Sequence, residues 1–171
     1  MQNVFSYPLK LEDMSAAVKK YNLKADTDDL TYIKELMNVP GVKSFEADIS
    51  VKLRKKDHEA DVWGNLKAVV TQTSVVSLED FDQTYQTDFK LKFDTKMTLS
   101  EQLELERETD DVPDIFENGK IDLAAIAMEQ LALILDDFPR KKGEVFEFVS
   151  EFDEETTHKN NPFAALEKLK K

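Results

Sequence analysis

The chain has 171 residues, of which 41% are hydrophobic, and this is enough to bury the core of one domain. Acidic residues number 35 and basic residues 23, so the formal net charge is −12. Nucleic acid binds proteins through lysine and arginine and is repelled on average by so acidic a chain. Contact with RNA therefore needs a local basic patch or a protein partner, and DNA is not an expected partner.

The chain has no cysteine, which excludes disulfides, thiol chemistry and thiolate metal sites and is typical of a cytoplasmic protein. No apolar run reaches the roughly 18 residues of a membrane span. The N-terminus lacks the basic region and apolar core of a secretory signal. We therefore expect a cytoplasmic protein without a membrane partner.

The N-terminal part predicts one short strand and two short helices. Residues 4–9 are typical of a strand, and Pro8 indicates a sheet edge or the end of that strand. The second helix begins near Thr27 or Asp28, where aspartates in the first turn match the helix dipole. The first helix is predicted by five apolar residues at helical spacing: Leu11, Met14, Ala17, Val18 and Tyr21.

A turn at Pro40-Gly41 is followed by residues whose apolar period is 2, which predicts long antiparallel strands. The first strand extends from Phe45 to Arg54 and ends in a polar turn over residues 55–59. The second continues through residues 62–70, with Trp63 on the face opposite the apolar residues, and the third spans residues 81–93. The apolar face of this meander needs a helix to cover it.

The most apolar stretch predicts that covering helix over residues 122–136. Gly119 is suited to the preceding turn, Asp122 to the N-cap, and Pro139 ends the helix. Apolar residues occupy most of its circumference, so we expect it to be buried. Glu129 is one of its few polar residues and is either a solvated position or a partner contact.

Residues 95–114 are rich in aspartate and glutamate and predict a solvated, mobile loop. Paired carboxylates perform acid–base chemistry only in a concave, partly desolvated site, which a polar loop does not offer. His58 and His158 stand among polar residues without a second ligand at metal spacing. No glycine-rich phosphate loop is present. We therefore expect no enzymatic activity, metal or cofactor.

The C-terminal part predicts a strand at residues 144–149, a flexible linker at 150–161 and a short amphipathic helix at 162–171. Phe163, Leu166 and Leu169 share one face of that helix. Because so short a helix is marginal alone in water, this face docks either onto the chain's own domain or into a partner's groove.

Lys52, Arg54 and Lys56 form the best basic patch of the predicted fold, on one strand face leading into the turn. This patch is either a contact for phosphate and RNA or the solvated face of an amphipathic strand. The predicted fold class is α+β, with one domain over residues 1–149. Its twisted antiparallel sheet has a three-strand central meander plus terminal strands, packed by one buried central helix and two short N-terminal helices.

Three segments together resemble the YceD-like family of large ribosomal RNA subunit accumulation proteins. They contain Trp-Gly-Asn-Leu at residues 63–66, Gly-Lys-Ile-Asp-Leu at 119–123 with Asp-Asp-Phe-Pro-Arg at 136–140, and Asn-Pro-Phe-Ala-Ala-Leu at 161–166. Many members carry Cys-x-x-Cys where this chain has Ser74 and Ser77. Since serine does not replace a thiolate as a zinc ligand, a metal role is not implied here.

The resemblance implies a non-catalytic factor that supports accumulation of large-subunit ribosomal RNA and assembly of the large ribosomal subunit. It implies ribosomal or assembly proteins as partners, with the large-subunit RNA precursor as a further candidate, and it favours partner docking for the C-terminal helix. A protein-binding adaptor without a ribosomal role is the alternative. A hydrolase would require Glu129 and a second acid to converge in a buried cleft.

Overall fold

The computed structural model describes residues 4–56, 58–110 and 112–145. Met1–Lys141 is one compact unit that holds all of the described helices and strands. Lys142–Lys171 is a second unit, of which residues 142–145 are described. Most of the predicted strand at 144–149, the linker at 150–161 and the helix with Phe163, Leu166 and Leu169 lie outside the described residues.

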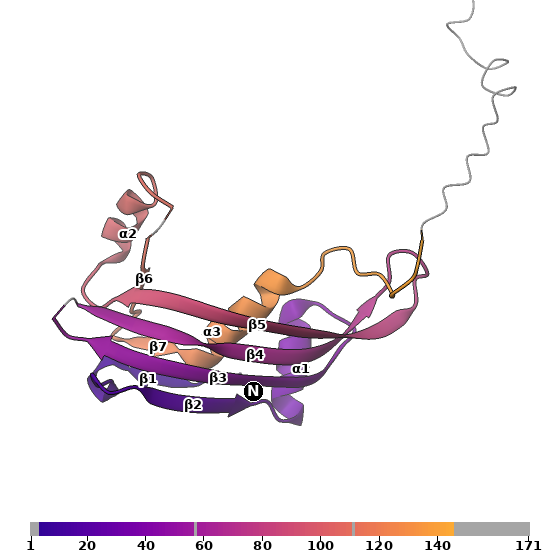
Figure 1. Ribbon diagram of the computed structural model, residues 1–171, viewed down its shortest axis with the longest axis horizontal. Helices are drawn as coiled ribbons and strands as arrows, with labels where there is room; N and C mark the ends of the chain where they lie inside the picture. Colours follow the sequence, from indigo (N-terminus) through magenta and orange to yellow (C-terminus); the bar gives the residue numbers. More distant parts are fainter. Residues whose placement is uncertain (1–3, 57, 111, 146–171) are drawn as a thin grey trace, which may run out of the picture. The chain divides into compact units, whose positions relative to one another are not determined.

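A five-stranded sheet with the order β2-β3-β4-β5-β6 is the centre of the first unit (Figure 1). The antiparallel meander of β3 (Gly41–Arg54), β4 (Glu59–Thr73) and β5 (Asp80–Asp94) confirms the three strands predicted from their period of 2. The two-residue strand β6 (Asp114–Ile115) pairs parallel to β5, so the sheet is mixed rather than purely antiparallel.

The first predicted N-terminal helix is wrong. Only a 3₁₀ turn forms at Leu11–Asp13, and the following residues form the strand β2 (Lys19–Lys24). In β2, Tyr21 lies opposite Ile49 and Leu23 opposite Ala47, in antiparallel register with β3. This pairing satisfies the backbone N–H and C=O groups on the edge of β3, and that requirement outweighs the local helical spacing.

The second predicted N-terminal helix is confirmed as α1 (Thr27–Met37). The Asp26 carboxylate accepts the N–H groups of Asp28 and Asp29 at 2.9 Å, and the Asp29 carboxylate accepts the Asp26 N–H at 3.0 Å. This reciprocal capping fixes where the helix begins. Ile33 points from α1 into the core and is fully buried.

The buried helix predicted at residues 122–136 is confirmed as α3 (Leu123–Ile134), which ends before Pro139. The Asp122 carboxylate caps it by accepting the N–H groups of Ala124 at 2.9 Å and Ala125 at 3.2 Å. Before α3, the strand β7 (Lys120–Asp122) pairs antiparallel with β1 (Pro8–Lys10). Six α3 residues are buried: Leu123, Ala124, Ile126, Ala127, Met128 and Leu131.

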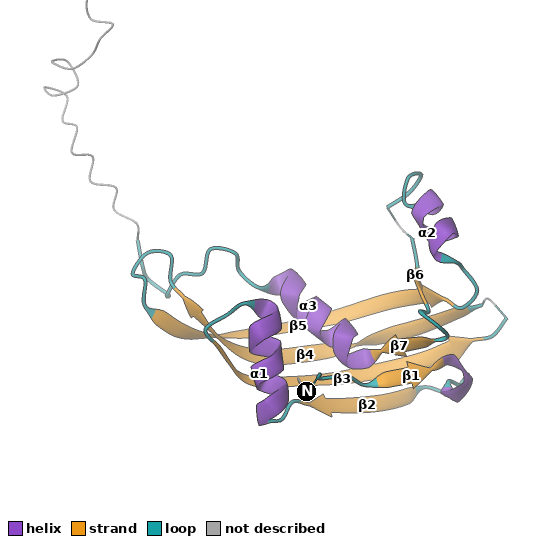
Figure 2. Ribbon diagram, turned by 180° about the vertical axis from the view of Figure 1, so that it is seen from behind, coloured by secondary structure: helices purple, strands orange, loops and turns teal. Residues whose placement is uncertain are grey.

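The sheet has one covered face and one open face. Helices α1 and α3 and the β1–β7 pair all lie on the covered face, which faces the reader in Figure 2. Along β4, the alternate residues Val62, Leu66 and Ala68 are fully buried against these elements. The opposite, open face is turned toward the reader in Figure 1 and is built mostly from polar side chains.

The acidic stretch at residues 95–114 contains a short helix that was not predicted, α2 (Leu99–Leu105). Its N-cap Thr98 accepts the Glu101 N–H, and the Glu101 carboxylate accepts the Thr98 N–H at 2.8 Å. The sequence signal for this helix is Thr-x-x-Glu, a capping box. Helix α2 packs beside β6 and stands at one end of the sheet (Figure 1).

Candidate nucleic-acid interface

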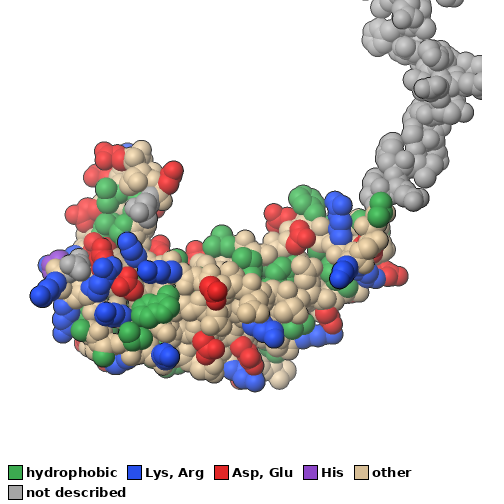
Figure 3. Space-filling model, in the orientation of Figure 1, with side chains coloured by type: hydrophobic (Ala, Val, Ile, Leu, Met, Phe, Trp, Pro, Cys, Tyr) green, Lys and Arg blue, Asp and Glu red, His purple; other side chains and the backbone are tan. Residues whose placement is uncertain are grey.

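The open face carries a groove of about 980 Å³ across β2, β3, β4 and β5. Its walls come from side chains that alternate outward from these strands, so the register of the sheet decides which residues meet. Two rows of facing residues form most of it. Figure 3 shows this face, with lysine and arginine side chains gathered at the end of the sheet where His58 lies.

The first row, here called the cationic row, crosses the sheet at Trp63. Lys20 on β2 lies opposite Ser50, Ser50 lies opposite Trp63, and Trp63 lies opposite Lys90 on β5. Trp63, the only tryptophan of the chain, is partly exposed and lines the groove. The row therefore combines an aromatic ring with a lysine on each outer strand.

The second row, here called the polar row, lies next to the cationic row. Asn22 is opposite Asp48, Asp48 is opposite Asn65, and Asn65 is opposite Asp88. The Asn22 amide donates a hydrogen bond to the Asp48 carboxylate at 2.7 Å. All four residues line the groove and are exposed, so they present amide and carboxylate groups to whatever occupies it.

The structure separates the three residues of the predicted basic patch. Lys52 lines the groove next to the cationic row. The Arg54 guanidinium binds the carboxylates of Glu59 and Asp61, with 3.0 Å between Arg54 Nε and Asp61 Oδ2. Lys56 is exposed in the β3–β4 turn, outside the groove lining.

The sequence pattern missed Lys20 and Lys90, which stand on β2 and β5 on either side of Trp63. The signal for Lys90 was present, because it alternates with the buried Phe89 on a predicted strand. Only the pairing register aligns it with Trp63. No such signal existed for Lys20, because its segment was predicted to be helical.

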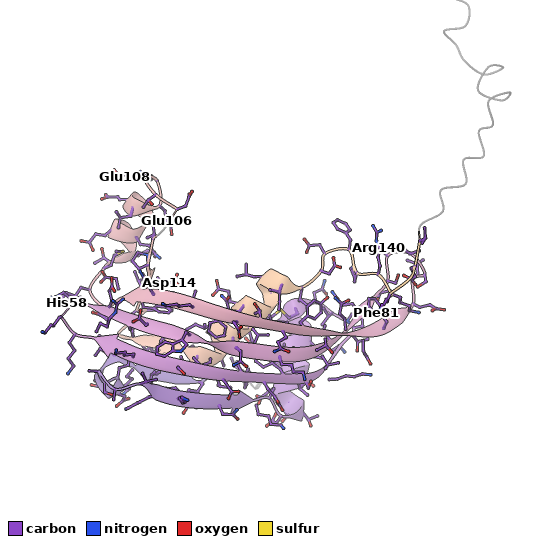
Figure 4. All side chains as sticks on the ribbon, in the orientation of Figure 1. His58, Phe81, Glu106, Glu108, Asp114 and Arg140 are labelled. Carbon is purple, nitrogen blue, oxygen red and sulfur yellow. The ribbon has the colours of Figure 1, made fainter. Side chains whose placement is uncertain are left out.

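Glu129 faces a separate acidic pocket of about 320 Å³ that Asp114 also lines. Partial burial of its carboxyl group raises the pKa of Asp114, although the residue as a whole is exposed, and the negative charges of Glu129 and Glu106 raise it further. Figure 4 shows Asp114 at the end of the sheet that carries α2. Glu129 is exposed, so within the described residues this pair does not form the buried cleft that a hydrolase would require.

A buried polar junction joins β4 and β5 to the segment after α3. The Tyr85 hydroxyl donates to the Gln72 side-chain oxygen, and the Gln72 amide donates to the Asp136 carbonyl at 3.1 Å. Burial raises the pKa of Tyr85, so its hydroxyl keeps the proton that it donates. These bonds satisfy a buried glutamine and hold the end of α3 against the sheet.

The turn between β4 and β5 is tied to the same segment. Ser74 is fully buried, and its hydroxyl accepts the N–H groups of Val76 at 3.1 Å and Ser77 at 3.3 Å. The Val75 N–H donates to the Pro139 carbonyl at 2.9 Å. The turn with Ser74 and Ser77, where many family members carry Cys-x-x-Cys, therefore meets the segment at 136–140 that carries part of the resemblance.

The part of the chain that the structure describes places no group of three or more histidine, aspartate or glutamate side chains where they could hold a metal ion. None of its helices is long and apolar enough to cross a membrane.

Residues 62–170 match the model of a protein family described as "Large ribosomal RNA subunit accumulation protein YceD". The chain belongs to this family. The match covers more than half of the chain and includes the segments that carry the resemblance. It begins in β4, so Trp63 and Lys90 lie within it, whereas Lys20 and Lys52 precede it. No curated protein and no solved structure matches the chain. The name of the family implies a role in the accumulation of large-subunit ribosomal RNA.

Proposed function

We propose that this YceD-family protein supports accumulation of large-subunit ribosomal RNA as a non-catalytic binding factor in assembly of the large ribosomal subunit. The family match over residues 62–170 carries this proposal. The open sheet face supports it, because its groove of about 980 Å³ is lined by an aromatic ring, lysines, amides and carboxylates that can bind a partner. Acid–base catalysis, by contrast, needs carboxylates held in a desolvated site, and Glu129 is exposed.

The proposed partners are ribosomal or assembly proteins and the large-subunit RNA precursor, met in the cytoplasm. A net charge of −12 complements basic partner proteins. Phe163, Leu166 and Leu169 lie outside the described residues and are the proposed anchors for a protein partner. Replacing all three by alanine should weaken co-sedimentation with that partner and leave the melting temperature unchanged. Unchanged binding with a lower melting temperature would mean that they dock on the chain's own domain.

The proposal is tested by gradient sedimentation of a cell lysate, together with quantification of both ribosomal RNAs after depletion of the protein. We expect the protein to migrate with large-subunit precursors. We also expect depletion to lower the large-subunit RNA selectively, and re-expression of the wild-type chain to restore it. A protein that stays at the top of the gradient, with both RNAs unchanged on depletion, would favour the adaptor function.

A further inference from the structure

We propose that the groove on the open face binds a short single-stranded RNA segment, with one base stacked on Trp63 and phosphates beside Lys20, Lys52 and Lys90. This inference rests on the proposed function and deepens it, because it assigns the RNA contact to a surface and to a chemistry. The argument depends on an aromatic ring, three lysines and a row of amides and carboxylates that the sheet register aligns.

The aromatic ring is the first support. The solvated face of an antiparallel sheet is ordinarily polar, and the other residues of the cationic row, Lys20, Ser50 and Lys90, follow that rule. Trp63 breaks it and remains partly exposed, with the exposed Val18 also lining the groove. Proteins that bind single-stranded nucleic acid stack its bases on such rings, and a sheet surface is a common platform for this.

The second support is the difference in ion pairing between the lysines in the groove and those outside it. Away from the groove, lysines of the same face are ion-paired: Lys24 lies 2.8 Å from Glu46, and Lys43 binds Asp82. Within the described residues, no carboxylate lies within ion-pair distance of Lys20, Lys52 or Lys90. These lysines can therefore attract phosphate, although Asp48, Asp61 and Asp88 line the same groove and the chain as a whole is acidic.

The carboxylates of the groove fit the same occupant. Arg54 binds the Asp61 carboxylate and so fixes its position in the groove. The Asp48 carboxylate accepts a hydrogen bond from the Asn22 amide. The polar row lies directly beside Trp63, where the edge of a stacked base would project. Carboxylates and amides accept hydrogen bonds from the amino groups of adenine and cytosine. The row thus favours those bases over uracil, which has no amino group.

Stacking of a base on Trp63 requires a single strand. The bases of a duplex are stacked inside the helix and present only their edges, so none can lie flat on Trp63. An unpaired segment can turn one base onto the ring and still place its neighbouring phosphates along the lysines. A single-stranded region of a ribosomal RNA precursor has this chemistry.

The test uses the full chain and oligoadenylate of about ten nucleotides. Because Trp63 is the only tryptophan, its fluorescence reports directly on the groove. We expect saturable quenching that weakens with salt, stronger with oligoadenylate than with oligouridylate and absent with an RNA duplex. Replacing Lys52 and Lys90 by glutamine should reduce the slope of log affinity against log salt by about 1.4, at about 0.7 per phosphate contact.

The matched control is the double variant Lys24→Gln and Lys43→Gln, which removes the same charge from ion-paired positions on the same face. It should leave affinity and salt slope near the wild-type values. Anisotropy of a labelled oligonucleotide should show binding roughly 5- to 150-fold weaker for Trp63→Ala, because one stacked base is lost. Binding should be largely retained for Trp63→Phe, which keeps an aromatic ring. Melting temperatures establish that each variant is folded.

The inference is overturned if no oligonucleotide changes Trp63 fluorescence at low salt, or if both double variants weaken RNA binding equally. It is also overturned if a protein partner, and not RNA, binds the groove and changes Trp63 fluorescence. Its failure is distinguishable from that of the proposed function. Loss of large-subunit RNA on depletion, without RNA binding by the purified chain, would leave the proposed function standing. Groove-dependent RNA binding with unchanged ribosomal RNA levels would support the inference and contradict the proposed function.

Discussion

The covered and open faces of the sheet are built from alternate residues of the same strands, yet they differ in burial, in polarity and in charge. Val62 and Leu66 of β4 are fully buried beneath the helices, while Trp63 between them faces the groove. Burial of apolar area on the covered face stabilises the fold. The open face leaves charged and aromatic groups accessible, so substitutions there should change binding without unfolding the protein, and those on the covered face should do the reverse.

The largest expected effect tests the covered face through α3. Leu131 is fully buried, so Leu131→Ala should lower the free energy of unfolding by about 2–5 kcal/mol through lost apolar contact and a residual cavity. Leu133 on the same helix is 71% exposed, so Leu133→Ala should change it by less than about 0.5 kcal/mol. Urea unfolding measures both. Equal effects would show that α3 does not cover the sheet as described.

The next effect concerns Gly64, where the backbones of β3 and β4 approach each other too closely for a side chain. A β-carbon at Gly64 would lie 2.1 Å from the backbone oxygen of Asp48 and 3.0 Å from the Cα of Ile49. Gly64→Ala must therefore push β3 away from β4, which should cost about 1–3 kcal/mol of unfolding free energy. Because Asp48 lines the groove, RNA affinity should fall as well. Asn65→Ala, at the next and exposed position, should leave stability within about 0.5 kcal/mol of the wild type.

A smaller effect tests how the covering helix is fixed. Asp122→Ala removes the cap of α3 and the carboxylate that accepts the Tyr7 N–H, and it should cost about 1–2 kcal/mol. Asn is a good N-cap, so Asp122→Asn should retain most of that stability near neutral pH. An equal loss in both variants, measured by urea unfolding, would show that the negative charge matters more than the cap.

Asp122 should also make the stability of the protein depend on pH. Burial alone would raise the pKa of Asp122, but hydrogen bonds from the Ser6 hydroxyl and from the N–H groups of Tyr7, Ala125 and Ala124 lower it below its usual value. The native carboxyl therefore binds its proton less readily than the unfolded one, and its stabilising contribution is full above the ordinary carboxyl pKa of about 3.9. As the pH falls through the native pKa this contribution is lost. The wild type should lose stability more steeply below about pH 4 than Asp122→Asn.

Much of the fold was predictable because local signals agreed with the tertiary structure. Period-2 alternation located β3, β4 and β5, and the Asp122 cap with the apolar run located α3. The region around Tyr21 was mispredicted because helical spacing and a strand-edge position compete there, and only the sheet decides between them. Helix α2 carried its signal in Thr98 and Glu101, a capping box that the acidic composition obscured.

The candidate interface was less predictable, because it depends on cross-strand register. Alternation correctly placed Trp63 on the face opposite the core, and Lys52 on the face that carries the groove. It could not align Lys20 and Lys90 with Trp63, since that requires the pairing of four strands. Nor could it show that Arg54 binds two carboxylates, since Glu59 and Asp61 belong to the neighbouring strand.

The smallest expected effect concerns Asp114 in β6, the strand at the edge of the sheet. Burial first, then the charges of Glu129 and Glu106, raises the pKa of Asp114, so the native carboxyl holds its proton more readily than the unfolded one. Stability should therefore decrease as the pH rises from the ordinary carboxyl pKa through the raised native value. Asp114→Asn should add about 0.5 kcal/mol or less at pH 7, because solvent screens the site, and nothing at pH 3.

The matched control for Asp114→Asn is Glu35→Gln, which removes one charge from an exposed position on α1 and should change stability at neither pH. If Glu129 acts on Asp114 through charge, Glu129→Gln should also stabilise at pH 7, and adding it to Asp114→Asn should contribute less than it does alone. Full additivity in this double-mutant cycle, measured by urea unfolding, would show that the two carboxylates do not interact. Burial and the charge of Glu106 would then account for the raised pKa of Asp114.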